Sequence, residues 1–518
     1  MTAVFQSLPA VFRGLQLGLL LSLSGLAGGC ASMITDAHTQ KEPLVSDYLS
    51  GRTEPVKAEL DRRLDEEDGF NADSAGTDEL MWRLESGSFY FHAKDYQRCL
   101  DELQTAERLI EEYDLRATVS LRDSAAEGLV LITNLNALPY RGFGRDRILL
   151  SVYKALAYLG CGRYDAFRVQ LRRLRQEQKL VRQKYQEFFA AEDAALKQAQ
   201  QDNPELAEQT ESEAGSPEKL AAYAENGQFA EAFREADAIS KRGYGDFLNP
   251  LAIFLSGLGN LLDGNAGNAK IDFDRLHRLL PNNRLIGDCR ITVSRLADRN
   301  DDNETEDTDE GMPFAIDRNC LYVIFAIGRT AALHEVAIEV PIMTAYPVCE
   351  FYQSPFRSAV VSTGALRRRA ELLADMDGIL AQEFQERLPG MITRIVLSTL
   401  VKEAAYYGAI AAISSSDMDD SAKEAALLVT ALGGAAYRSA VNTADTRTWE
   451  LIPKEFRLAI LPMPQERWIE FKLSGSAPVS DRIAIPESCD SAIVYIGAFS
   501  PENLSVHVFP LTETRSVQ

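Results

Sequence analysis

The stretch FLSGLGNLLDGNAGNAKIDFDRLHRLLPNN, residues Phe254–Asn283, has the residue spacing of two antiparallel helices packed together. Gly257 falls near the middle of the first helix, where the missing side chain lets the second helix approach closely. Gly264 marks the turn, and Ala269 is compact enough to lie between the helices. Pro281 follows the second helix, which it cannot continue. The spacing predicts a helical hairpin.

Three more stretches carry parts of this pattern at uneven intervals. Their matching positions are Gly87, Tyr90 and Tyr96; Ala155, Tyr158 and Tyr164; and Gly227, Ala232 and Ala236. The pattern resembles the tetratricopeptide repeat (TPR), which has a period of about 34 residues. The resemblance implies an all-α, TPR-like helical-repeat domain over residues 76–297, with Tyr90 and Tyr158 as packing residues. The alternative is an α-helical bundle without repeats.

Stacked helical hairpins form a concave groove that commonly holds a peptide or a protein. We therefore expect a protein-binding domain here. The chain is acidic, with a formal net charge of −22. Nucleic-acid binding is not expected, because contacts with phosphates need a concentrated basic face.

The segment LSGLAGGCASM, Leu23–Met33, ends an apolar run and contains one cysteine. The run is of signal-peptide length and too short for a comfortable transmembrane helix. Ala27, Gly28 and Gly29 precede Cys30, which resembles the bacterial lipobox, with Ala27 in the place of the usual leucine. The resemblance implies a lipoprotein signal peptide over residues 1–29 and lipidation of Cys30. The alternatives are an ordinary cleaved signal or an N-terminal anchor helix.

Ala31 follows the cysteine, and by the same resemblance it implies sorting to the outer membrane. The expected location is the periplasmic face, with the lipid on Cys30 as the membrane contact. The segments Gly144–Gln178, Ala381–Arg394 and Ala444–Pro464 are similar to a poorly characterised family of bacterial lipoproteins with TPR-like repeats. The resemblance implies a mixed C-terminal domain after the repeats. It supplies no catalytic residues.

Residues 30–75 are mostly polar and predict a tether with one amphipathic helix at Val56–Leu64. Residues 298–312, DRNDDNETEDTDEGM, hold eight carboxylates and predict an acidic linker. A calcium loop is the alternative, but Asn303 stands where the sharp turn needs glycine, and the final bidentate Glu is missing. No metal site is therefore expected.

Residues 313–518 change to a strand pattern and predict an α+β domain. A hairpin is expected from Cys320–Gly328 and His334–Ile342. The other expected elements are a strand in Ser358–Thr363, helices at Leu366–Leu388, Met391–Ile413 and Ser421–Ala435, and five short strands after residue 455. The small, apolar residues of the helical part allow two interpretations, a helix pair packed on the sheet or a hairpin that touches a membrane or a second copy.

Asp445 and Arg447 form a possible ligand clamp, because a guanidinium can bind a carboxylate through two hydrogen bonds. The alternative is that they fix a loop above Trp449. The chain has no HExxH, GxSxG or P-loop motif, and the SxxK match at Ser151–Lys154 lacks its companion motifs. We therefore expect no catalytic residues and no cofactor.

The sequence thus favours a mixed chain, a TPR-like helical-repeat domain followed by an α+β domain at residues 313–518. The expected function is an outer-membrane lipoprotein that holds a protein partner of the cell envelope. The alternatives are an enzyme or enzyme regulator that acts on peptidoglycan or another envelope polymer, and a subunit of an assembly or secretion machine. The sequence does not fix the oligomeric state.

Overall fold

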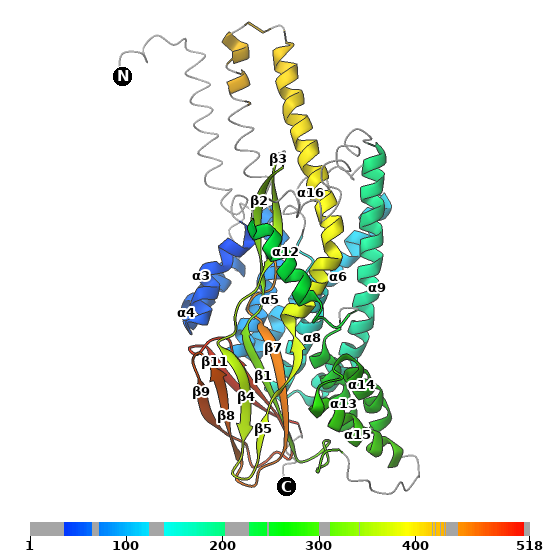
Figure 1. Ribbon diagram of the computed structural model, residues 1–518, viewed down its shortest axis with the longest axis vertical. Helices are drawn as coiled ribbons and strands as arrows, with labels where there is room; N and C mark the ends of the chain where they lie inside the picture. The colour runs from blue at the N-terminus through cyan, green and yellow to red at the C-terminus, as the bar shows by residue number, and fades with distance from the viewer. Residues whose placement is uncertain are drawn as a thin grey trace, which may run out of the picture.

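The computed structural model describes residues 36–64, 72–123, 139–202, 227–245, 248–299, 311–340, 342–416, 418–419, 421–424, 426–428, 430 and 444–511. A helical region up to residue 299 is followed by a region with β-sheets, which confirms the mixed fold class. The molecule is elongated (Figure 1), and α16 (Met376–Ser414) extends past the rest of the described body at one end. The sequence positions of the expected signal peptide, Cys30 and most of the acidic linker lie outside the described residues.

The helical region contains ten described helices. They are α3 (Ala37–Leu49), α4 (Thr53–Leu64), α5 (Ala72–His92), α6 (Tyr96–Asp123), α8 (Gly144–Gly160), α9 (Tyr164–Asp202), α12 (Gly227–Ser240), α13 (Pro250–Leu262), α14 (Ala266–Leu279) and α15 (Arg284–Arg299). The helix α3 was not predicted, and α3 and α4 occupy much of the expected tether. Both pack on the body, with Lys41, Val56 and Leu60 fully buried. Apolar and paired side chains on one face explain why these helices bind to the body.

Three helical hairpins, α5–α6, α8–α9 and α13–α14, follow one another. A Cβ atom at Gly87 would lie 2.3 Å from Leu103, and one at Gly257 would lie 2.9 Å from Phe273. Both glycines therefore allow the close approach that the sequence pattern indicates. Neighbouring hairpins join through α6 with α8 and α9 with α13.

The other predicted packing residues fall within or beside these hairpins. Ala155 and Ala269 are fully buried, and Pro281 is exposed just after α14. The third predicted unit differs, because α12 packs on α16 and β3 (Ile342–Glu350) instead of on the hairpins. Its residues Ala232 and Ala236 contribute to an apolar pocket there. The apolar face of α12 thus packs on α16 and β3, and α12 does not belong to the series of hairpins.

Two sheets form the lower part of the molecule in Figure 1. The five-stranded sheet has the order β11-β10-β1-β7-β6, and the four-stranded sheet has the order β5-β4-β8-β9. Their strands are β1 (Cys320–Arg329), β4 (Phe356–Ser362), β5 (Arg367–Arg369), β6 (Glu371–Asp375), β7 (Pro453–Pro462), β8 (Trp468–Gly475), β9 (Val479–Ala484), β10 (Ala492–Ala498) and β11 (Leu504–Pro510). Among the described strand pairs, β1 with β10 is parallel and the rest are antiparallel.

The side chains of β1 alternate between two cores. Val323 and Phe325 face the four-stranded sheet, and Tyr322 and Ile324 face the helices. The five-stranded sheet is therefore the middle of three layers. A strand with both faces buried is apolar at every position, which explains the continuous apolar run of β1.

Three predictions for this region are wrong. The strand β1 does not pair with β2 (Ala332–Val340); instead β2 pairs with β3, which was not predicted as a strand. The predicted helix Leu366–Leu388 begins only at Met376, because β5 and β6 occupy residues 367–375 and Asp375 caps the helix through the N–H of Gly378. The helix then continues through Pro389 to Ser414, so the two predicted helices are one.

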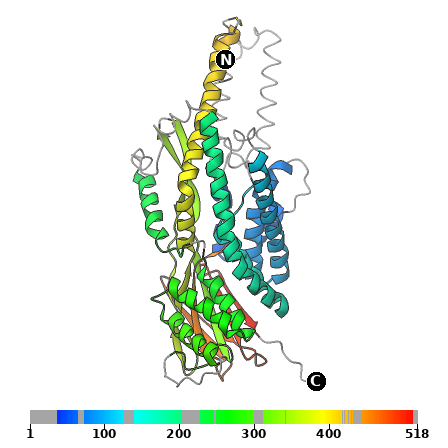
Figure 2. The ribbon, with the colours of Figure 1, turned by 90° about the vertical axis from the view of Figure 1, so that its right-hand side faces the viewer.

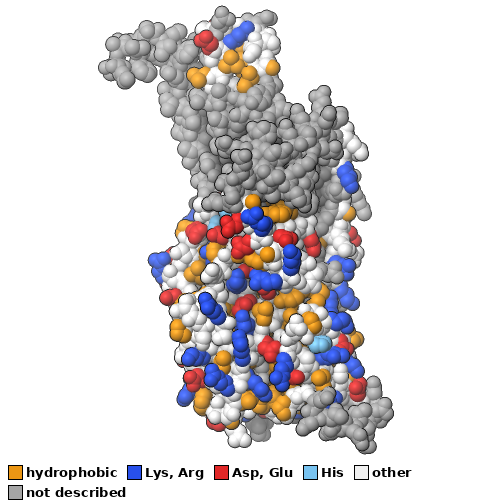
Figure 3. Space-filling model, viewed as in Figure 1, with side chains coloured by type: hydrophobic (Ala, Val, Ile, Leu, Met, Phe, Trp, Pro, Cys, Tyr) orange, Lys and Arg blue, Asp and Glu red, His pale blue; other side chains and the backbone are white. Residues whose placement is uncertain are grey.

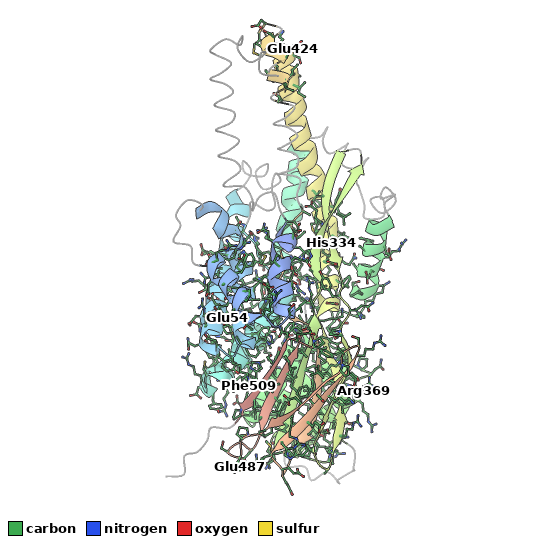
Figure 4. The ribbon with its side chains drawn as sticks, turned by 90° about the vertical axis from the view of Figure 1, so that its left-hand side faces the viewer. Glu54, His334, Arg369, Glu424, Glu487 and Phe509 are labelled. Atoms are coloured by element: carbon green, nitrogen blue, oxygen red, sulfur yellow. The ribbon has the colours of Figure 1, made fainter. Side chains whose placement is uncertain are left out.

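Helix α16 has 39 residues, which corresponds to about 58 Å of helix. Part of it lies beside α9 (Figure 2), and its lower part contacts α12 and β3. Among the described residues, no helix combines the length and the hydropathy needed to cross a bilayer. In Figure 4, Glu424 lies at the far end of the part of the molecule that protrudes beyond the body. His334 lies near the base of the β2–β3 hairpin.

Candidate functional site

The segment 444–452 lies between the N-terminal helices and the sheets, and every residue in it except Asp445 is buried. The chain returns here after the protruding end. Glu85 on α5 accepts hydrogen bonds from the backbone N–H groups of Glu450 (2.9 Å) and Leu451 (2.8 Å). The Trp449 indole donates to Ser88 Oγ at 3.0 Å. Side chains of α5 thus satisfy polar groups of a buried segment that has no strand partner at these positions.

Lys41 on α3 lies at the centre of a buried ion-pair core. Its Nζ is 2.8 Å from Glu450 Oε1 and 3.2 Å from Glu85 Oε1, and it also donates to the carbonyl of Thr448. All three charged side chains are fully buried. Burial alone would raise the pKa of Glu450, but Lys41 and His38 lower it to about 2. Burial raises the pKa of Glu85 despite the nearby Lys41.

His38 and Arg329 extend the core to the base of the β2–β3 hairpin. Both contact Glu450, at 3.4 Å from His38 Nδ1 and 3.2 Å from Arg329 Nη2. The His38 ring also lies 3.6 Å from Glu350 at the end of β3. Burial opposes the imidazolium charge, but Glu450 outweighs it and raises the pKa of His38. The N-terminal arm, which consists of Asp36 and α3, therefore meets the base of the β2–β3 hairpin and the 444–452 segment at this ion-pair core.

Arg145 on α8 is the second buried cation at this junction. Its guanidinium donates to Thr448 Oγ1 (2.7 Å), to the Trp449 carbonyl (3.1 Å) and to Thr330 Oγ1 (3.1 Å). At the start of the same helix, Glu383 of α16 accepts from the N–H of Gly144 at 2.6 Å. A carboxylate at a helix N-terminus is favourable because the free N–H groups point toward it. The base of α16 is thereby fixed to α8.

Asp445 and Arg447 contact each other, as a clamp would. However, Arg447 donates to both Asp445 oxygens at 2.8 Å, and its third nitrogen donates to Asp78 at 3.0 Å. The Arg447 side chain is only 4% exposed. In this arrangement the pair fixes the 444–452 segment to α5, and the guanidinium is not open to a ligand.

The predicted tyrosines have different surroundings. Tyr90 donates to Asp61 at 3.0 Å beneath the Arg98 guanidinium, and Tyr158 accepts from Gln104 at 3.3 Å. Tyr96 Oη lies 2.8 Å from Nδ1 of His507 on β11. Tyr90 and Tyr158 thus contact helices, whereas Tyr96 connects the helical region to the sheet.

A buried aromatic cluster surrounds His507. Its ring stacks on Phe91 of α5, and His92 lies 3.0 Å from Ser505 Oγ of the same strand. Burial lowers the pKa of His507 to about 3 and lowers that of His92 well below its ordinary value. Both rings are therefore neutral near pH 7.

The first helix of each hairpin is covered by other parts of the same chain, namely the five-stranded sheet and the 444–452 segment. Residues 84–92 of α5, 144–157 of α8 and 250–259 of α13 are all buried. Phe91 contacts Tyr495, Tyr153 contacts Trp449, and Phe254 contacts Tyr322. In a repeat array these first helices would line the concave groove. The five-stranded sheet and the 444–452 segment occupy that place here.

No family model, no curated protein and no solved structure matches this chain. The resemblance to lipoproteins with repeats therefore depends on the quoted residues alone. Within the described ranges, no group of three His, Cys, Asp or Glu residues could hold a metal ion. The pocket between α12, β3 and α16 is apolar, with Phe233, Tyr346 and Leu388 in its wall.

Sequence reasoning missed the ion-pair core. A signal was present in MWRLESGSFYF (Met81–Phe91), where Glu85 is the only carboxylate among mostly apolar and small residues. A charge in such a place requires a partner. Nothing in the local pattern of Lys41 identifies it as that partner, because the two residues meet only in the folded chain.

Proposed function

We propose that this chain is a bacterial outer-membrane lipoprotein, anchored through a lipid on Cys30 and located on the periplasmic face. It acts as a protein-binding scaffold of the cell envelope. Its TPR-like repeats hold its own sheet domain on one side and present their second helices to an envelope partner on the other.

The position of the N-terminal arm supports the anchored arrangement. Asp36 accepts a hydrogen bond from Thr446 at 3.1 Å, and the His38 N–H donates to the same hydroxyl at 3.2 Å. Five residues lie between Cys30 and Asp36, and the six steps of chain span at most about 22 Å. A lipid on Cys30 would therefore lie close to the junction from which the β2–β3 hairpin and α16 extend. The five-stranded and four-stranded sheets, which together we call the sandwich, would point away from the membrane.

The observation that carries the binding role is the exposed surface of the second helices. Leu115 on α6 is 67% exposed, and Ile271 on α14 is 53% exposed. Val169 and Leu180 on α9 are also exposed, and an 11-residue spacing places them on one face of that helix. Of the six large apolar side chains that are exposed among the described residues, these four lie on the second helices, and grouped exposed apolar residues are typical of a binding surface. The filled groove leaves this outer surface as the place for a partner.

Site-specific photo-crosslinking in cells tests this function. A photoreactive residue at Val169 or Leu180 is expected to give one reproducible heterologous protein adduct. The same residue at Lys57, which is exposed on α4, is the matched control. Adducts that are equal at all three sites, or absent from α9, would contradict the scaffold. In parallel, Cys30→Ser should move the protein from the membrane fraction to the soluble fraction, and continued membrane fractionation would exclude the lipid anchor.

A further inference from the structure

The outer face of the four-stranded sheet concentrates positive charge in an acidic protein. The inner side chains Ala359, Val361 and Phe471 are buried against the other sheet, so their neighbours point outward. The register places Arg369 and Lys472 on either side of Val360, and Arg367 opposite Ser362. Arg482 of β9 lies opposite Glu470 of β8. We call Arg367, Arg369, Lys472 and Arg482, together with Trp468, the basic sheet face.

Among the described residues these cations form no ion pair, although the register places the Glu470 carboxylate between Ser362 and Arg482 on the same face. No described carboxylate oxygen lies within 4.0 Å of the charged nitrogens of Arg367, Arg369, Lys472 or Arg482. Some other exposed cations of the protein are paired, such as Arg62 with Glu59 and Arg290 with Asp274. Figure 3 shows that Lys and Arg predominate over the lower part of this side of the molecule. In a chain of net charge −22, such a surface attracts anions selectively.

An aromatic side chain lies beside these charges. Trp468 is partly exposed, and the Arg482 guanidinium lies 4.0 Å from the centre of its ring. Stacking on the indole holds the guanidinium in place while its N–H groups remain free for a carboxylate. Neighbouring strands are about 4.8 Å apart, so the face presents donors in rows that a chain with repeated carboxylates can follow.

We propose that the basic sheet face binds peptidoglycan through the carboxylates of its peptide stems. The proposal rests on the proposed envelope location, but binding itself does not require the lipid. Each contact of an exposed cation is weak, and a polymer gains affinity because many contacts form at once. The face belongs to the sandwich, where Figure 4 places Arg369, and the N-terminal arm joins the molecule at the other end of the sheet region. This placement favours the cell wall over the anchoring membrane as the occupant.

Co-sedimentation with purified, insoluble peptidoglycan sacculi tests the proposal. The full chain carrying Cys30→Ser, in buffer at low salt, is expected to pellet with sacculi and to be released at high salt. Arg367→Glu/Arg369→Glu/Lys472→Glu should lower the apparent affinity at least about tenfold. The matched control, Arg108→Glu/Arg173→Glu/Lys179→Glu, changes the net charge equally on exposed positions of α6 and α9 and should bind like the parent.

Two further arms identify the ligand. Sacculi whose carboxylates have been converted to amides should lose binding, and phosphatidylglycerol vesicles should bind much less protein than sacculi. The proposal is overturned if the parent does not pellet, if both triple variants bind alike, if amidated sacculi bind fully, or if vesicles bind equally well. Thermal unfolding of both variants confirms that they are folded. Failure of Cys30→Ser to leave the membrane would count against the lipid anchor and would not alter this result.

Discussion

Lys41 is the residue through which the N-terminal arm is held. Its ammonium group compensates two carboxylates, one on α5 and one on the 444–452 segment. Removing one member of a buried charge group is costly, because the remaining charges keep their desolvation penalty without the compensating attraction. The arm therefore depends on this lysine more than on any single apolar contact of α3.

Replacement of Lys41 by methionine tests this dependence. Lys41→Met keeps the length of the side chain and leaves Glu85 and Glu450 buried together, so we expect a loss of about 3–5 kcal/mol in the free energy of unfolding. Urea denaturation followed by circular dichroism measures it. Lys57→Met on the exposed face of α4 is the control and should change stability by less than about 0.5 kcal/mol. Equal stability of the two variants would show that the ion-pair core is not structural.

Single residues differ in how well the sequence predicts them. Gly87 and Gly257 are predictable because the close contact occurs within one hairpin, a short distance along the chain. Lys41 and Glu450 are more than 400 residues apart, and neither position has a local pattern that points to the other. Arg447 and Asp78 are another pair of this kind, 369 residues apart along the chain. Long-range polar contacts of this kind are visible only when the fold is known.

At the scale of elements, α5 and β11 meet through two neutral histidines. His92 and His507 lie on opposite sides of the boundary between the helices and the five-stranded sheet. Protonation of either ring would place an uncompensated charge in an aromatic cluster. The contact between these elements is therefore sensitive to acid.

The direction of the pH effect follows from linkage. The pKa of His507 is about 3 in the folded protein against an ordinary 6.5, so below pH 6.5 the unfolded chain binds a proton that the folded chain does not. Stability is complete above pH 6.5 and falls toward pH 3 by about 1.4 kcal/mol per pH unit for this residue. His507→Phe, compared with the parent by urea denaturation from pH 8 to pH 4, should have a smaller slope by that amount. An unchanged slope would mean that His507 is protonated in the folded state.

The sequence predicts some elements better than others for a physical reason. The five C-terminal strands and the helical hairpins have strong periodic patterns and occur near their predicted positions. The pairing of β1 was wrong because its nearest strand in sequence, β2, is not its partner; β7 and β10 are more than 100 residues away. Helix α16 passes through Pro389, a residue that ordinarily ends a helix, and its single span is therefore not predictable from local rules.

At the scale of the whole molecule, helices and sheet share one core. Leu84, Leu156 and Phe254 belong to the same buried cluster as Tyr322 and Tyr495. The sequence predicts a helical array and an α+β region as successive parts. It does not predict that the second part covers the first helices of the hairpins, because nothing in the hairpin pattern indicates what packs on them.

The shared core leads us to a prediction about residues 301–310, which connect the two parts. Brief proteolysis by an enzyme specific for acidic residues is expected to cut within 301–310, where the sequence predicts a charged linker. Because helices on one side and strands on the other bury the same apolar surface, the two fragments should stay together.

Gel filtration of the nicked protein provides the measurement. The fragments should co-elute at the volume of the intact chain under native conditions and separate only in denaturant. As a control, the intact protein and the nicked protein should give one cooperative thermal transition each. Separation of the fragments in native buffer, or two transitions in the intact chain, would show that the helical region and the sheets are independent domains and that the first helices of the hairpins are open to a partner.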